Sequence, residues 1–132
     1  MIFLDTSYIK GLILKNDSYQ LFSENIKPIL ETETKATNIT VLVEVLNSLK
    51  PNNFNGDIRE IIFQLLNLDA FDWLTADDYN SAMDLFNYYG GSVNYADCTI
   101  LQSMQNHGIS RIVSFDSDFD KIRGIQRISG FN

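Results

Sequence analysis

The sequence is poor in cysteine and in basic residues. It has one cysteine, one histidine and ten Lys and Arg residues against seventeen acidic ones, which gives a net charge of −7. A single cysteine cannot form an internal disulfide, and the chain therefore suits a reducing compartment. Surfaces that coat DNA without specificity need clustered Lys and Arg, so the charge disfavours that class of protein while leaving room for a small nucleic-acid site.

Long hydrophobic runs are also missing. No apolar run approaches the roughly 20 residues that span a bilayer, and the first residues lack a basic stretch followed by a long apolar one. We therefore expect a soluble, unexported, cytoplasmic protein with no membrane partner. The sequence also lacks repeats, low-complexity segments and linkers rich in Pro, Gly or Ser, and its 132 residues predict one domain over 1–132.

Short apolar runs alternate with longer amphipathic patterns along the chain. The apolar runs predict strands over 1–4, 35–39, 70–74, 111–115 and 125–128. The amphipathic patterns predict helices over 7–14, 19–30 with Pro28 as its weak point, 41–49 with Thr40 as its N-cap, 58–66, 75–89 and 95–107. Strands separated by helices indicate an α/β fold, with a mainly parallel central sheet that helices flank on both faces.

Carboxylates follow two of the predicted strands. Asp5 comes directly after IFL, and Asp116 comes after IVSF. In open parallel sheets, sites form beyond the carboxyl ends of the strands, so both side chains are expected at one sheet edge. Asp97 lies in the middle of the apolar stripe of its helix, where an unpaired charge is costly. Glu44 borders the apolar stripe of another helix.

Each carboxylate also has an ordinary structural explanation. Asp5 and Asp116 can cap a helix and a turn, and Asp97 can interact with a helix dipole. Glu44 alone is typical of a solvated helix residue, and Asp120 of a surface residue. The convergence of four carboxylates on one predicted sheet edge favours a shared site over four coincidences.

Clustered carboxylates need a cation to stay ionised together, because like charges raise one another's pKa. Oxygen ligands alone indicate Mg²⁺, with Mn²⁺ as a substitute, whereas zinc is disfavoured because His107 and Cys98 are the only soft candidates. The spacing within SFDSDFD also suggests a calcium loop of the EF-hand type. That loop is excluded because Lys121 stands where it needs glycine and Arg127 where it needs a bidentate glutamate.

Four segments together resemble the PIN-domain family. They are FLDTSYI, TNITVLVEVLNSL, YADCTILQSMQNHGI and IVSFDSDFDKIRGIQRI, in this order over nearly the whole chain. The most similar type is the VapC-type toxin ribonuclease of VapBC toxin–antitoxin systems. The resemblance implies an acidic catalytic and metal-binding site, supporting hydroxyl groups and a secondary ligand at Asp118. The implied acidic residues are Asp5, Glu44, Asp97 and Asp116, and the supporting residues are Thr6, Ser7 and Ser114.

The implied activity is Mg²⁺-dependent endoribonuclease cleavage of single-stranded or looped RNA that leaves a 5′-phosphate. The implied partners are an RNA substrate, a cognate antitoxin whose tail covers a groove and the site, and a second copy in a homodimer. Apolar positions such as Ile13, Leu14 and those of the 58–68 segment are candidates for the partner surfaces, although core burial is the default for each.

Side chains beside the site are candidates for RNA contacts. Aromatic rings can stack on bases and basic groups can contact phosphates, with core packing or ordinary surface charge as the alternative for each. The aromatic candidates are Tyr8, Phe115 and Phe119, and the basic ones are Lys10, Lys121 and Arg123. Cys98 departs from the small residue common in the family after the third aspartate, and we interpret it as a packing residue.

Other functions stay open at this stage. A PIN-domain nuclease of RNA processing without an antitoxin has the same sequence features, and so does a non-catalytic PIN-like binding module. A phosphotransfer receiver needs a central phosphoacceptor aspartate and a late lysine, which the AFDWL segment does not supply clearly. A hydrolase with an aspartyl nucleophile needs a second aspartate where Ser7 stands.

Overall fold

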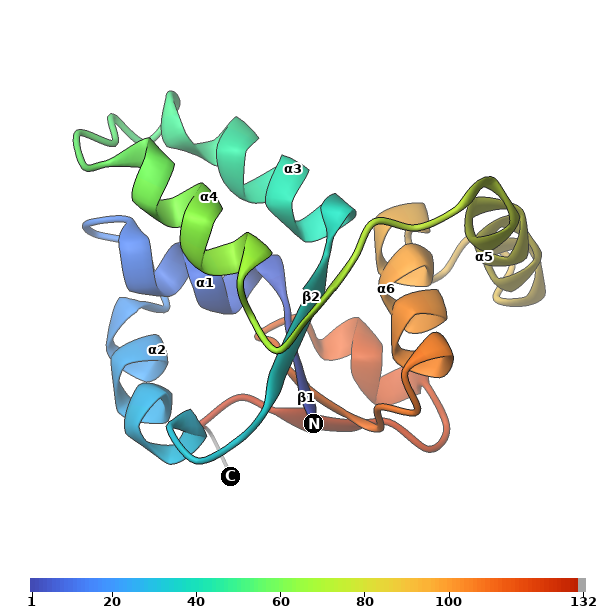
Figure 1. Ribbon diagram of the computed structural model, residues 1–132. Coiled ribbons are helices and arrows are strands. Elements are labelled where there is room, and N and C mark those ends of the chain that lie inside the picture. Colours follow the sequence, from blue (N-terminus) through green and yellow to red (C-terminus); the bar gives the residue numbers. More distant parts are fainter. Residues whose placement is uncertain (131–132) are drawn as a thin grey trace.

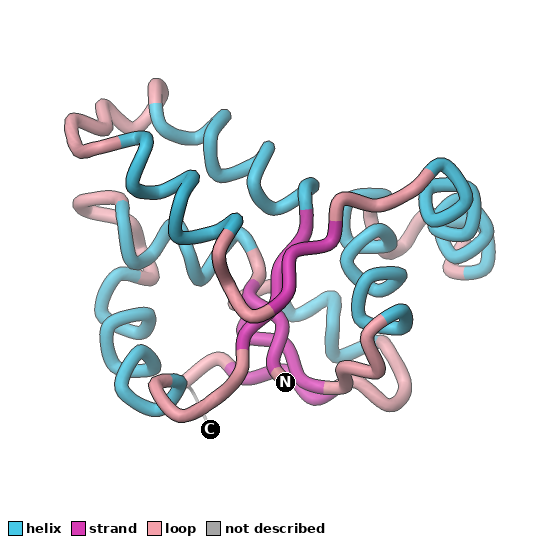
Figure 2. Tube along the Cα trace, viewed as in Figure 1, coloured by secondary structure: helices cyan, strands magenta, loops and turns pink. Residues whose placement is uncertain are grey.

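A five-stranded parallel sheet forms the centre of the molecule. The computed structural model describes residues 1–130, and positions 131 and 132 of the expected domain lie outside the described residues. The strands have the spatial order β3-β2-β1-β4-β5, and all four neighbouring pairs are parallel. Figures 1 and 2 show this sheet between two groups of helices. The strand bounds are β1 Ile2–Leu4, β2 Lys35–Asn38, β3 Ala70–Asp72, β4 Arg111–Val113 and β5 Gln126–Ile128.

Helices connect the strands and cover both sides of the sheet. Figure 1 shows α1 to α4 on one side and α6 on the other, with α5 packed outside α6. The α-helices are α1 Thr6–Ile13, α2 Gln20–Ile26, α3 Ile39–Leu49, α4 Ile58–Leu66, α5 Ala76–Tyr88 and α6 Tyr95–Asn106, and the 3₁₀ helices are η1 Lys27–Leu30 and η2 Ser117–Lys121. This arrangement confirms the α/β fold with helices on both faces.

The direction of the chain across the sheet reverses at β1. From β1 the chain proceeds to β2 and β3, and after α5 and α6 it returns to place β4 along the opposite edge of β1. Connections leave such a switch point in opposite directions, so an opening forms beyond the carboxyl ends of the two strands. Asp5 follows β1 and Ser114 follows β4, and the topology therefore places both residues at this opening.

The central strands and α6 form the core. The apolar side chains of β1 and β4 are almost completely buried, as Ile2, Phe3, Ile112 and Val113 show. Strands that are buried on both faces have continuous apolar sequences, and the apolar runs of these two strands fit that pattern. All residues from 97 to 104 of α6 are buried as well, because α6 lies between the sheet and α5. The polar side chains in this stretch are therefore inside the protein and need partners there.

Several elements end earlier than the apolar pattern predicts, among them the strand expected over 111–115, which stops at Val113. The strand expected over 70–74 stops at Asp72, because Trp73 is exposed and Leu74 has a positive φ of 61°. The helix expected over 19–30 divides into α2 and η1, and Pro28 lies in the 3₁₀ part. Proline lacks the N–H group that a continuing α-helix requires, so the weak point expected at Pro28 is where the helix changes type.

The prediction of Thr40 as the N-cap of α3 is wrong, and Asn38 caps the helix instead. The Asn38 side chain accepts a hydrogen bond from the Val41 N–H at 3.0 Å. Its amide group donates to Ser103 Oγ of α6 at 3.0 Å, and the residue is completely buried. The Thr40 hydroxyl is hydrogen-bonded to that of Thr99 at 2.8 Å. Asn38 and Thr40 are both residue types that can cap a helix. Their contacts with α6, which is distant in the sequence, decide that Asn38 is the cap.

Among the helices of the described residues, none is both long enough and apolar enough to cross a bilayer.

Replacing Asn38 by alanine is expected to lower the free energy of unfolding by about 1–3 kcal/mol, because the change removes a cap and leaves buried polar groups without a partner. Urea denaturation measures this loss. The matched control is Asn52→Ala near the other end of α3, where an exposed amide donates to the Ser48 carbonyl oxygen. Equal losses in the two variants would contradict the assigned role of Asn38.

Candidate metal centre

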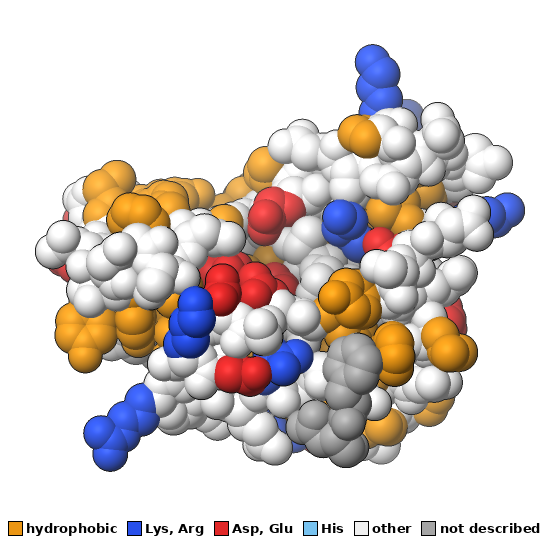
Figure 3. All heavy atoms as spheres, turned by 180° about the vertical axis from the view of Figure 1, so that it is seen from behind, with side chains coloured by type: hydrophobic (Ala, Val, Ile, Leu, Met, Phe, Trp, Pro, Cys, Tyr) orange, Lys and Arg blue, Asp and Glu red, His pale blue; other side chains and the backbone are white. Residues whose placement is uncertain are grey.

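Three carboxylates lie close together at the switch point of the sheet. One carboxylate oxygen from each of Asp97, Asp116 and Asp118 lies within 4.8 Å of the other two. Asp97 comes from the first turn of α6, whereas the other two follow β4 at the start of η2. Figure 3 shows acidic side chains gathered in a hollow on one face of the molecule, with Lys and Arg side chains around it. We call Asp97, Asp116 and Asp118 the carboxylate cluster.

Asp97 is the buried member of the cluster. It is only 7% exposed, and within the described part of the chain its Oδ2 atom has no hydrogen-bond partner. Burial raises the pKa of this carboxyl to about 8, and the negative charges of Asp5, Asp116 and Glu44 add to the rise. The N-terminal position in α6 favours a negative charge but does not offset these effects. A cation beside Oδ2 would compensate the charge of Asp97 directly.

Asp5, at the end of β1, is not one of the three carboxylates of the cluster, but its charge adds to the rise in the pKa of Asp97. Asp5 is the N-cap residue of α1, yet its side chain makes no capping hydrogen bond, so capping does not explain its presence. The carboxylate instead accepts hydrogen bonds from the hydroxyls of Ser7 and Ser114. Burial raises the pKa of Asp5 to about 6, although these hydrogen bonds lower it. The structure thus holds a buried carboxylate in one orientation through side chains from α1 and from the end of β4.

The hydroxyl groups expected to support the site do contact it. Ser7 Oγ accepts a hydrogen bond from the Phe115 N–H at 3.0 Å, and Ser114 Oγ accepts one from the Asp116 N–H at 3.0 Å. These contacts tie the loop after β4 to α1. Thr6 Oγ1 donates to Glu44 Oε1 at 2.9 Å, which brings α3 to the same place. Glu44 itself is exposed, so it stands at the solvent side of the site.

Asp116 and Asp118 have additional partners. The Asp116 carboxylate accepts a hydrogen bond from the Asp118 N–H at 2.9 Å and so caps η2, which was the structural alternative for this residue. Asp116 caps η2 and is at the same time a member of the carboxylate cluster. Asp118 forms a 2.8 Å ion pair with Lys121, three residues further along. Lys121 was expected to contact a phosphate or to be an ordinary surface charge, and its spacing of three residues from Asp118 suits an ion pair on a helix.

Two other expectations have clear outcomes. Asp120 pairs with Arg127 at 2.9 Å and stays on the surface, as predicted. Cys98 is completely buried and packs in the core, also as predicted.

The aromatic candidates for RNA stacking are in the interior. Tyr8, Phe115 and Phe119 are 3%, 8% and 0% exposed. Phe115 is stacked on Tyr19, with ring centroids 4.4 Å apart. These rings pack in the hydrophobic core because they follow or face the central strands, and base stacking by them is excluded. Any aromatic contact with RNA has to come from other residues.

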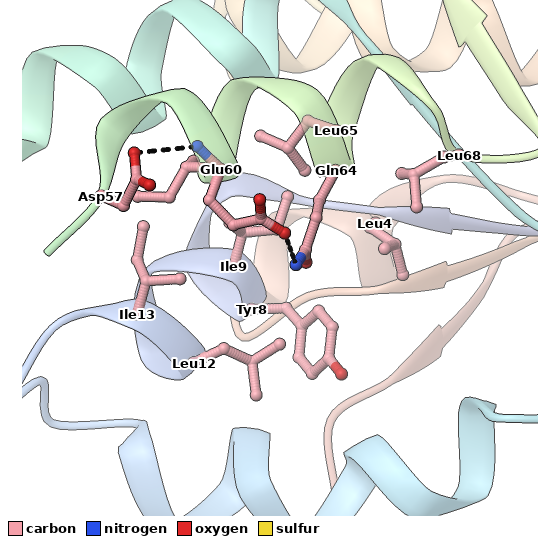
Figure 4. Close-up of a pocket in the computed structure, with 11 residues that line it drawn as sticks. Leu4, Tyr8, Ile9, Leu12, Ile13, Asp57, Glu60, Gln64, Leu65 and Leu68 are labelled. Carbon is pink, nitrogen blue, oxygen red and sulfur yellow. Dashed lines mark hydrogen bonds between the residues drawn. The ribbon is translucent and has the colours of Figure 1, made fainter.

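A separate apolar cavity lies between α1 and α4. It has a volume of about 340 Å³, and Figure 4 shows Ile9 and Ile13 of α1 pointing toward α4, while Leu12 lies further from α4, beside Tyr8. Glu60 and Gln64 stand at its rim on α4, joined by a 2.7 Å hydrogen bond. Ile13 is therefore only partly buried, whereas Leu14 is in the core. We call this cavity the α1–α4 groove.

The donor set of the cluster suits a hard divalent cation. Its ligand atoms are all carboxylate oxygens, which Mg²⁺ and Mn²⁺ prefer over the nitrogen and sulfur ligands typical of zinc. The unpartnered oxygen of Asp97 gives the strongest support, since a buried carboxylate oxygen is costly without a positive charge or donor. A cation held here would lie beside an exposed glutamate and a hollow open to solvent, as metal-assisted hydrolysis requires.

Comparison with solved structures supports the same fold. A Mycobacterium tuberculosis toxin, VapC20, which cleaves the sarcin–ricin loop, is 22% identical with a TM-score of 0.79 over 92% of this chain and 94% of its own. A chain of a toxin–antitoxin complex from Klebsiella pneumoniae is 16% identical with a TM-score of 0.74, over 100% and 99% of the two chains. A chain of DNA-bound VapBC from Salmonella typhimurium is 18% identical with a TM-score of 0.67, over 98% and 97%.

The sequence itself gives the family. No curated protein matches the sequence significantly. Residues 2–125, however, match the PIN domain family, and this match spans every strand and helix described above except the last strand. The chain therefore belongs to the PIN domain family.

Proposed function

We propose that the chain is a Mg²⁺-dependent endoribonuclease that hydrolyses phosphodiester bonds in RNA, and that it is the toxin of a VapBC-like toxin–antitoxin system. The observation that carries the proposal is the buried, unpartnered oxygen of Asp97 within a cluster of carboxylates. Membership of the PIN domain family and the toxin chains among the similar structures support it.

Four carboxylates would hold the metal. Asp97, Asp116 and Asp118 provide the cluster, and Asp5 is the fourth, with its orientation set by Ser7 and Ser114. Bound Mg²⁺, or Mn²⁺ in its place, would attract the scissile phosphate and lower the pKa of a water molecule. Asp118 would exchange its ion pair with Lys121 for the metal, which frees the lysine ammonium for a phosphate oxygen.

Glu44 is suited to a different task. It is exposed at the solvent side of the site, and Thr6 fixes one of its oxygens through a 2.9 Å hydrogen bond. Its other oxygen is available to accept a proton from the attacking water, or to orient that water for in-line attack. Asp5 and Asp97 would then be metal ligands, and Glu44 would orient or deprotonate the attacking water.

The partner in such a system would be an antitoxin. Chains of toxin–antitoxin complexes are among the similar structures, and the α1–α4 groove offers an apolar surface with acidic groups at its rim. An amphipathic segment with apolar side chains and basic flanks fits that surface. We also propose a homodimer, for which exposed apolar side chains such as Phe63, Trp73 and Tyr88 are available.

Two alternatives lead to different observations. A PIN nuclease of RNA processing would cut RNA but would have no antitoxin, so its gene would not stand beside one for a small DNA-binding protein. A non-catalytic module would bind RNA or protein without cutting RNA in Mg²⁺ or Mn²⁺. The buried carboxylate of Asp97 favours a nuclease over this module. Burying a carboxylate without a partner lowers stability, and a catalytic role explains why the chain has one here.

Replacing Asp97 by asparagine is expected to reduce Mg²⁺-dependent RNA cleavage by at least about a thousandfold, because the metal loses a ligand of full charge. Ser114→Ala removes a hydrogen bond to Asp5 and is expected to reduce cleavage by about 10- to 100-fold. Gel analysis of end-labelled RNA measures both losses. Asp120→Asn, in the same SFDSDFD segment, is the control and should cut RNA like the wild type. A wild-type protein that cuts no RNA in Mg²⁺ or Mn²⁺ would refute the proposal.

The metal-free protein is expected to lose stability as the pH rises from about 4 to about 8. Asp5 and Asp97 keep their protons up to about 6 and about 8 in the folded state, whereas the ordinary value is 3.8. The folded state therefore binds more protons than the unfolded state in this range, and stability falls with pH. In Asp97→Asn the fall should be smaller and the melting temperature at pH 8 a few degrees higher than in the wild type.

Added Mg²⁺ is expected to raise the melting temperature more at pH 8 than at pH 5, because protons compete with the cation for the same oxygens. Thermal unfolding with and without EDTA measures this difference. An equal rise at both pH values, or a rise that persists in Asp97→Asn, would contradict the assignment of the metal to the carboxylate cluster.

Replacing Leu12 by glutamate places a charge inside the α1–α4 groove and is expected to abolish capture of the proposed antitoxin when the two proteins are co-expressed. The control is Leu21→Glu, at a position that is 68% exposed on α2 outside the groove. RNA cleavage by the isolated Leu12→Glu variant should remain. Capture that survives Leu12→Glu would show that the antitoxin binds elsewhere.

A further inference from the structure

A second hollow lies next to the carboxylate cluster, between α3, α5 and α6. It has a volume of about 270 Å³, and we call it the α3–α6 pocket. Glu44 lines one end of this pocket, and the same carboxylate accepts the hydrogen bond from Thr6 beside Asp5. The pocket therefore opens directly beside the proposed site of cleavage. On α6 it adjoins Ala96, the residue immediately before Asp97.

Flat and apolar surfaces make up most of the pocket wall. Tyr79 of α5 and Tyr95 of α6 both line it, and both are only partly buried. The Tyr95 hydroxyl donates to the Tyr79 carbonyl oxygen at 2.8 Å, and Phe86 packs against the Tyr95 ring edge-on at 6.3 Å. These contacts hold the Tyr95 ring in one position. Val43 of α3 adds an apolar side chain that is 48% exposed.

One polar group lies among these apolar surfaces. The hydroxyls of Thr40 and Thr99 are 2.8 Å apart, and Thr99 also donates to the Ala96 carbonyl oxygen at 2.6 Å. If the Thr99 proton is used in this way, Thr40 donates to Thr99, and the lone pairs of the Thr40 oxygen stay available to a ligand. The pocket thus combines aromatic faces with a hydrogen-bond acceptor at a defined position.

Of the parts of an RNA strand, the base fits this pocket best. The carboxylate of Glu44 repels a phosphate, and among the described residues that line the pocket there is no Lys or Arg to bind one. A base has apolar π-faces for the tyrosine rings and donor groups at its edge for Thr40. Because Glu44 belongs to both the pocket and the site, a base here would lie next to the phosphate that is cleaved.

We propose that the α3–α6 pocket binds one unpaired base of the RNA substrate, adjacent to the scissile phosphate. This inference rests on the proposed ribonuclease function. It assigns base contacts to Tyr79 and Tyr95, after the structure has excluded Tyr8, Phe115 and Phe119 from that role by burying them. It also explains why α5 carries an aromatic side chain toward the acidic site although it contributes no carboxylate to the cluster.

Ala96→Leu tests the proposal, because the larger side chain fills the pocket. The backbone carbonyl oxygen of residue 96, which accepts the hydrogen bond from Thr99, is retained. The probe is a short single-stranded oligoribonucleotide that contains the fluorescent base 2-aminopurine, with Ca²⁺ in place of Mg²⁺. Base stacking on the tyrosines should quench the fluorescence on binding to the wild type. The variant is expected to bind with a Kd roughly 5- to 100-fold higher, the effect of losing one stacked base.

Matched variants separate base binding from damage to the fold. Gln105→Leu adds the same side chain at an exposed position of α6 outside the pocket and should bind like the wild type. Tyr79→Ala should weaken binding, whereas Tyr79→Phe, which keeps the ring, should not. The Mg²⁺-induced rise in melting temperature should be the same in Ala96→Leu as in the wild type, since the carboxylate cluster is unchanged.

The outcomes also separate this inference from the proposed function. Equal Kd values for Ala96→Leu and the wild type, or no binding by the wild type, would overturn the base site even if the protein cuts RNA. Pocket-dependent quenching by a protein that cuts no RNA would support the base site and refute the nuclease.

Discussion

The burial of carboxylates close to one another is the constraint on which the rest of this structure depends. Asp5 and Asp97 are both more than nine-tenths buried, and burial raises the pKa of each carboxyl. The negative charge of Asp5 adds to the rise at Asp97. Hydroxyl groups of Ser7 and Ser114 compensate Asp5, but within the described residues Asp97 Oδ2 has no such partner. Without a cation, the arrangement is most stable when both carboxyl groups keep their protons. The proposed metal would stabilise the charged forms at higher pH, and it would in this way link folding to metal binding and activity.

The parallel sheet makes this crowding possible. Its switch point lies between β1 and β4, so the loops after these two strands diverge and leave room for side chains from α3 and α6. Burial of α6 between the sheet and α5 lowers the polarity around Asp97, while Glu44 on α3 stays in contact with solvent. One side of the site is thus dry and the other wet. Such an asymmetry suits a reaction in which water attacks a bound phosphate.

Three surfaces divide the tasks of the proposed toxin. The carboxylate cluster and the α3–α6 pocket lie next to each other through Glu44, and together they would bind a phosphate and a neighbouring base. The α1–α4 groove is made by other helices and has no residue in common with the cluster. A partner seated in that groove could therefore bind without replacing the metal ligands, and inhibition would require an additional segment that reaches the carboxylates.

The sequence by itself indicated the order of the strands and α-helices along the chain, the parallel α/β class and the carboxylates that follow β1 and β4, because apolar periodicity and strand ends are local properties. Only the tertiary structure decided that Asn38 rather than Thr40 caps α3, that Phe119 is in the core, and that Asp118 stands in the cluster while Glu44 stands at its solvent side. Each of these outcomes depends on contacts between residues far apart in the chain, whose burial and partners no local pattern encodes.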